Sequence, residues 1–95
     1  MITKYHLTRR EAEAIEKVLG DLGFVRQPRP RGTLNVVFHG TNEEDPYIEV
    51  GYIELAEERP FLRVLGETRS RVEEFVQRIF NEARVSPRKP ILAYT

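Results

Sequence analysis

The chain has 95 residues, so a single hydrophobic core is the expectation. Hydrophobic residues make up 40% of the sequence and charged residues 32%, a balance that is typical of a folded globular protein and excludes a disordered chain. The absence of cysteine excludes disulfides, thiolate metal sites and thiol nucleophiles. Basic and acidic residues balance at 15 each, so the net charge does not favour nucleic acid as a partner.

The N-terminal residues lack the apolar run of a signal peptide, and no apolar run is long enough to cross a bilayer. We therefore expect a cytoplasmic protein with no membrane partner. The sequence is rich in arginine and poor in serine, glutamine and asparagine. Such a composition occurs in thermophilic proteins and also follows from GC-rich coding, so both explanations stay open.

The first predicted elements are a short strand, Ile2–Leu7, and a helix that follows it. The spacing of Thr8 and Glu11 predicts a capping box, in which each side chain bonds the other residue's backbone N–H. Apolar residues then recur at helical spacing, and Gly23 is placed to end the helix in the left-handed conformation. Residues 26–32 are rich in proline and arginine, which predicts a stiff cationic loop.

Three strands are expected next. Residues 33–39 alternate, with Leu34, Val36 and Phe38 on one side. Residues 47–55 form a second strand, whose alternation slips at Gly51 and predicts a bulge there. Residues 61–65 form the third strand. The turns between these strands are acidic, and residues 41–60 carry a net charge of −6.

A second helix is predicted from a continuous apolar stripe that includes Phe75, Ile79 and Phe80. Ser70 followed by Glu73 predicts another capping box, and Ser86-Pro87 predicts the end of the helix. The tail contains the apolar run 91–94, which we expect to pack on the domain or to pair as a strand.

Together these elements predict an α+β fold in the order (β)-α-β-β-β-α-(β). Its sheet has three to five mostly antiparallel strands, and both helices lie on one face of the sheet. We expect residues 1–86 to form a single α+β domain and residues 87–95 to form the packed or strand-pairing tail.

No catalytic or metal-binding set is predicted. His6 and His39 are the only histidines, too few to bind a metal without carboxylate help. The acidic run at 43–45 lacks the ligand spacing of a calcium loop. Phosphate-binding glycine loops and nucleophile motifs are missing from the sequence. We therefore expect a protein that is not an enzyme and has no cofactor, metal or catalytic residue.

The leading hypothesis is a small protein-interaction or oligomerisation module that binds a protein partner or a second copy of itself, as a homodimer. If both helices cover one face of the sheet, the other face carries more apolar side chains than a solvent-exposed face usually shows, and such patches mark partners. The predicted partner-binding residues are Val37, Tyr47, Tyr52, Phe61 and Leu65.

The alternative hypothesis is nucleic-acid or anion binding by the cationic loop together with the start of the second helix. The predicted anion-binding residues are Arg26, Arg29, Arg31, Arg69 and Arg71. The same loop is opposite in charge to the acidic segment 41–60, so it could instead meet that segment in a second copy or meet an acidic partner.

The αβββα order is similar to that of the double-stranded-RNA-binding domain, whose last helix begins with a lysine-rich motif. Here the corresponding stretch, Thr68-Arg69-Ser70-Arg71, contains arginines instead. The family's histidine-containing loop is replaced by the acidic stretch 40–45, which would repel phosphate. The order also resembles secretion-chaperone-like folds, which bind other proteins through a sheet face, and that resemblance implies a protein partner.

Overall fold

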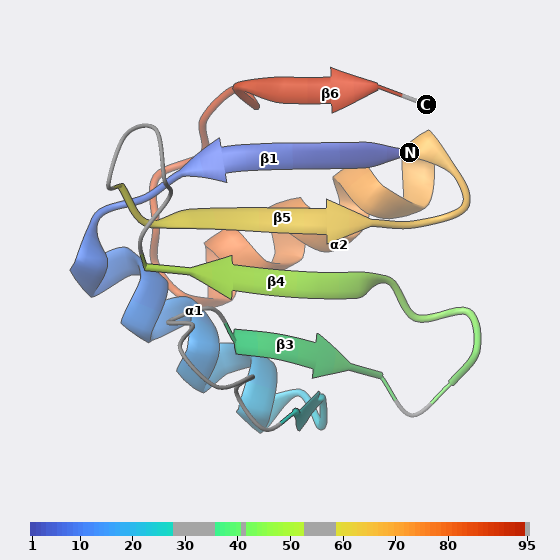
Figure 1. Cartoon of the computed structure of the whole chain (residues 1–95), viewed down its shortest axis with the longest axis horizontal. Helices are drawn as coiled ribbons and strands as arrows, with labels where there is room; N and C mark the ends of the chain where they lie inside the picture. Colours follow the sequence, from blue (N-terminus) through green and yellow to red (C-terminus); the bar gives the residue numbers. More distant parts are fainter. Residues whose placement is uncertain (28–35, 41, 53–58, 95) are drawn as a thin grey trace.

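The computed structural model describes residues 1–27, 36–40, 42–52 and 59–94. Within them, one antiparallel sheet is covered on one face by both helices (Figure 1). This arrangement confirms the predicted α+β class. The elements in chain order are β1 (Ile2–His6), α1 (Arg9–Asp21), β2 (Val25–Arg26), β3 (Val36–His39), β4 (Tyr47–Gly51), β5 (Phe61–Leu65), α2 (Arg69–Glu82) and β6 (Leu92–Tyr94).

The sheet has six strands in the order β2-β3-β4-β5-β1-β6, and every neighbouring pair is antiparallel. The first strand of the chain therefore lies between β5 and β6, so segments from both ends of the sequence are side by side in one sheet (Figure 1). The predicted tail strand is confirmed as β6. The short edge strand β2 is one element more than the sequence predicted, because Val25 and Arg26 pair with β3 before the proline-rich segment begins.

The first helix begins and ends as predicted. The Thr8 hydroxyl accepts a hydrogen bond from the Glu11 N–H at 3.1 Å, and the Glu11 carboxylate accepts one from the Thr8 N–H at 2.8 Å, which completes the capping box. At the other end, Gly23 has a φ of +91°, and the Phe24 N–H bonds the Leu19 carbonyl. This pattern is a Schellman motif, which requires a left-handed residue just after the helix.

The second helix begins at a different residue from the one predicted. Thr68 is the N-cap and accepts a hydrogen bond from the Arg71 N–H, whereas Ser70 lies inside the first turn. Glu73, the expected partner of Ser70, instead accepts a hydrogen bond from Arg69. The helix also ends before Ser86-Pro87, because Arg84 adopts a left-handed φ of 56° and reverses the chain.

Of the strand predicted at residues 47–55, the structure shows β4, which ends at Gly51. β4 keeps a regular register with β5 up to Gly51, which pairs with Phe61, so no bulge occurs at Gly51. The remainder of that prediction, at 53–58, lies outside the described residues, as does Leu34 of the strand predicted at 33–39.

The core forms between the sheet and the two helices. Inward-facing strand residues such as Val36, Ile48 and Leu62 are fully buried against Ile15 of α1 and Ile79 of α2. The predicted burial of Ile79 and Phe80 is confirmed. Phe75 is only partly buried, and its ring packs against Phe24 at 5.3 Å between centroids.

Arg88 lies between α2 and β6 and binds residues at the start of α1. Its guanidinium donates hydrogen bonds to both carboxylate oxygens of Glu11 and, at 3.0 Å, to the His6 carbonyl. It also lies over the ring of Phe80, 5.8 Å from the centroid. The tail is therefore held before it reaches its place beside β1. Neither helix in the described ranges is long and apolar enough to cross a bilayer.

Candidate interaction surface

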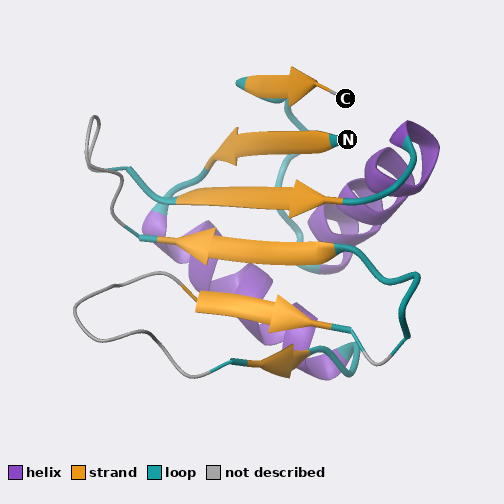
Figure 2. Cartoon of the chain, turned by 45° about the vertical axis from the view of Figure 1, so that its right-hand side comes forward, coloured by secondary structure: helices purple, strands orange, loops and turns teal. Residues whose placement is uncertain are grey.

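The face of the sheet opposite the helices is open in the described part of the chain (Figure 2). Directly paired residues of antiparallel strands point to the same side, so the register of the sheet arranges this face in rows that cross the strands. We describe three such rows, because each has a different chemistry.

The first row is apolar and aromatic, and it crosses the sheet near one end of the strands. Val25 pairs with His39, Tyr47 pairs with Leu65, and Leu65 pairs with Ile2. The His39 and Tyr47 rings meet edge to face at 5.4 Å between centroids, which links β3 to β4. We call Val25, His39, Tyr47, Leu65 and Ile2 the apolar row. In β6, the backbone of Tyr94 continues it beside Ile2.

The apolar row is exposed to a degree that is unusual for its residue types. Val25 is 52% exposed, Leu65 44% and Tyr47 38%, and these are three of the four large exposed apolar side chains of the described residues. The fourth, Ile91, lies outside the row, just before β6. Clustering of this kind distinguishes the row from the single exposed apolar residues that every protein surface carries.

The second row contains charges of both signs. Val37 pairs with Glu49, Glu49 with Arg63, and Arg63 with Lys4. The Arg63 guanidinium and the Glu49 carboxylate form an ion pair with 2.6 Å between nitrogen and oxygen. We call these four residues the charged row.

The third row is already covered within the chain. Phe61 points to the open face, yet it is only 5% exposed, and the Lys4 ammonium lies 4.5 Å from its ring centroid. Gly51, its partner in β4, is buried as well. Among the described residues, the open face is therefore exposed mainly at the apolar row and the charged row.

Four of the five predicted partner-binding residues lie on the open face, and one does not. Val37, Tyr47 and Leu65 are accessible there, while Phe61 is there but buried. Tyr52 lies on the opposite side of the sheet, because it follows Gly51 by one residue and the side alternates along the chain. Its hydroxyl donates to Glu16 of α1.

The sequence analysis missed Val25, His39 and Ile2. Ile2 and His39 lay in predicted strands and Val25 did not, and the place of all three in one row depends on pairings between β1 and β5 and between β2 and β3. Such register between distant segments has no local signal in a single sequence.

The predicted anion-binding arginines that the structure describes are each paired with a carboxylate. Arg26 contacts Glu16 at 3.5 Å, Arg69 contacts Glu73 at 2.9 Å, and Arg71 contacts Glu44 at 3.1 Å. Arg29 and Arg31 lie outside the described residues. The contact of Arg71 also shows that the acidic turn after β3 meets a basic residue of its own chain.

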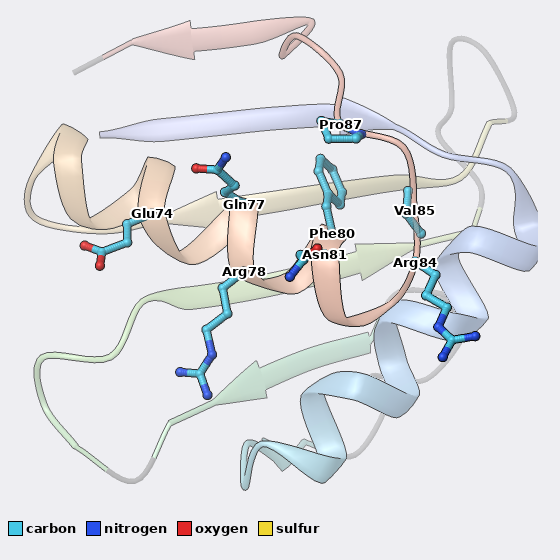
Figure 3. Close-up of a pocket in the computed structure, with 8 residues that line it drawn as sticks. All are labelled: Glu74, Gln77, Arg78, Phe80, Asn81, Arg84, Val85 and Pro87. Atoms are coloured by element: carbon cyan, nitrogen blue, oxygen red, sulfur yellow. The ribbon is translucent and has the colours of Figure 1, made fainter.

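Two hollows on the helix side are candidate small-molecule sites, and in the first the polar side chains do not converge on one point. One of about 540 Å³ runs along the outer side of α2, above Phe80. Figure 3 shows its charged side chains, Glu74, Arg78 and Arg84, pointing away from one another. A small-molecule site needs polar groups that converge on the ligand, so this hollow is better described as an uneven helix surface.

A second hollow, of about 430 Å³, lies where the start of α2 faces β1 and β6 and includes Thr3, Tyr5 and Glu73. Burial raises the pKa of the Tyr5 hydroxyl, and the nearby Glu73 charge raises it further. The hydroxyl is therefore protonated at neutral pH and is a hydrogen-bond donor, not a base.

No group of three or more residues among those described has the types and spacing to hold a metal ion. Comparison with family models, curated proteins and solved structures finds no match for the chain. The assignment of the open face as a candidate interaction surface is therefore based on the geometry of this chain alone.

Proposed function

We propose that the chain is a small protein-interaction module that binds a partner protein through the open face of its sheet. The observation that carries this proposal is the apolar row, whose members come from five strands and place their side chains on one exposed face. Removing such a surface from water contributes roughly 25 cal/mol for each Å² of apolar area, which gives the row a direct driving force for binding.

The chemistry of the two rows fits a protein surface. Protein interfaces are enriched in tyrosine and arginine and combine apolar contacts with paired polar groups. Here Tyr47 and Leu65 lie on the two central strands of the sheet, and the Arg63–Glu49 ion pair lies beside them. No described feature favours the anion-binding alternative over this one, because the described candidate arginines already have carboxylate partners.

The proposal is tested by capture experiments with three forms of the chain. Immobilised parent, Leu65→Asp and Ile91→Asp are exposed to extract from the native host. The two variants introduce the same charge at side chains of similar exposure, 44% and 49%, but only Leu65 belongs to the apolar row. We expect Leu65→Asp to lose the partner that the parent and Ile91→Asp retain.

Tyr47→Asp provides an independent variant on the neighbouring strand and should behave like Leu65→Asp. Circular dichroism of each variant verifies that the fold is intact. Equal retention by all four forms would show that the partner binds elsewhere and would overturn the proposal.

A further inference from the structure

We infer that the open face binds a second copy of this chain, as a two-fold dimer in which each row of side chains meets the same row of the other copy. This inference rests on the proposed function, because it uses the same surface, and it adds the identity of the partner. Its main support is the arrangement of charge on the central strands.

The centre of the charged row, the Glu49–Arg63 ion pair, is complementary to itself, whereas at the ends of the row Val37 of one copy would face Lys4 of the other. Glu49 lies on β4 and Arg63 lies at the paired position of β5, the two central strands among the six. A two-fold axis that runs parallel to the strands, between β4 and β5, places β4 of each copy over β5 of the other. Glu49 of one copy then faces Arg63 of the other, and by symmetry the contact occurs twice. Each intrachain Arg63–Glu49 ion pair therefore lies antiparallel to the same pair of the other copy, so every charge has an opposite charge beside it and another facing it.

The same operation matches the apolar row with itself. Tyr47 of one copy faces Leu65 of the other, and His39 faces Ile2, so two of the three most exposed apolar side chains of the row, Tyr47 and Leu65, lie against one another. Face-to-face sheets pack about 10 Å apart with their strands aligned to within about 30°, which this axis permits.

The size of the surface indicates a weak dimer. Strand spacing of about 4.8 Å and residue spacing of about 3.4 Å give two rows across six strands a footprint of roughly 400 Å² on each copy. Standard stable interfaces bury about 800 Å² of accessible surface on each partner. We therefore expect a dissociation constant in the micromolar range.

The test exchanges charge at the two central positions. Glu49→Arg alone places two arginines opposite two arginines across the interface, and Arg63→Glu alone does the same with carboxylates. We expect each variant to self-associate at least tenfold more weakly than the parent.

An equimolar mixture of the two variants restores both contacts. The arginine introduced in one variant faces the glutamate introduced in the other, and the unchanged Arg63 of the first faces the unchanged Glu49 of the second. Heterodimers should therefore form with an affinity near that of the parent.

Sedimentation velocity measures all four samples, and circular dichroism verifies that each variant folds. A parent that stays monomeric at about 1 mM would overturn the inference, and so would single variants that associate like the parent or a mixture that stays monomeric. If the inference fails while Leu65→Asp still loses a different captured protein, the proposed function stands with another partner. If neither association depends on the open face, both fail.

Discussion

Arg84 is held in a backbone conformation that its side chain disfavours. Its φ of 56° lies in the left-handed region, where a residue with a Cβ loses roughly 1 kcal/mol relative to glycine. We predict that Arg84→Gly raises the free energy of unfolding by about this amount.

Gly23 occupies the equivalent position after α1, and a Cβ there would meet no atom within 4 Å. Gly23→Ala should therefore lower the free energy of unfolding by a similar amount, through backbone strain alone. Urea denaturation measures both, and two changes of the same sign would contradict the assignment of the caps.

The sequence pattern predicted Ser70 as the N-cap of α2, whereas Thr68 is the N-cap in the structure. Because the Thr68 hydroxyl satisfies the Arg71 N–H, we predict that Thr68→Ala lowers the free energy of unfolding by about 1 kcal/mol. Ser70→Ala serves as the matched control and should change stability little. If Ser70→Ala costs more than Thr68→Ala in urea denaturation, the helix begins where the sequence pattern predicted.

Glu11 links the cap of α1 to the tail. Burial alone would raise the pKa of its carboxyl, but hydrogen bonds from Arg88 and from Thr8, with the Arg88 charge, outweigh it and hold the pKa below its usual value. A carboxyl whose pKa is lowered by folding stabilises the native state above its unfolded pKa, and the stabilisation disappears as the pH falls through the folded pKa.

We therefore predict that Arg88→Ala lowers the free energy of unfolding at pH 7 by roughly 1–2 kcal/mol, between the values for exposed pairs and for well-formed charged hydrogen bonds. The difference from the parent should shrink as the pH falls below the ordinary pKa of a glutamate and through the lowered pKa of Glu11 in the folded state. Arg78→Ala loses only an exposed pair with Glu82 and should change stability little. A deficit for Arg88→Ala that is independent of pH would show that its contact with Glu11 does not carry the effect.

At the scale of the element, the buried residues of α2 form one stripe along the helix: Val72, Val76, Ile79 and Phe80. Phe80 is 2% exposed, and its ring meets Tyr5 edge to face at 5.2 Å between centroids. We predict that Phe80→Ala costs about 3–5 kcal/mol through lost burial and a cavity. Phe75→Ala, at a partly buried position of the same helix, should cost less than half as much. Thermal or urea unfolding gives both values, and equal costs would mean that the register of the helix is wrong.

Helix ends could be predicted from the sequence where the residues that form them are close together in the chain. Both ends of α1 depend on residues within a few positions of one another, so Thr8, Glu11 and Gly23 predicted them correctly. At the start of α2, the spacing of Ser70 and Glu73 predicted the wrong N-cap, since Thr68 is the N-cap and the Glu73 carboxylate bonds Arg69 instead. Tyr52 was ambiguous because its side of the sheet depends on where β4 ends.

At the scale of the whole molecule, the unpredicted features are those that depend on contacts between distant segments. The sequence predicted the α+β class, the helices on one face and a tail strand. It did not place β1 between β5 and β6, and that placement brings Ile2 beside Leu65. The apolar row is a product of this register, so its full extent became visible only in the folded chain.

The central claim is that the chain associates through its open face, and methyl NMR tests it most directly. Spectra of methyl-labelled chain are recorded as the concentration rises from about 10 µM to about 1 mM, a range that brackets the expected affinity. We predict concentration-dependent shifts at the methyl groups of Val25, Leu65 and Ile2, with little change at Ile91 or at the buried Ile79. Shifts confined to Ile91, or spectra that stay constant over the whole range, would contradict self-association through the open face.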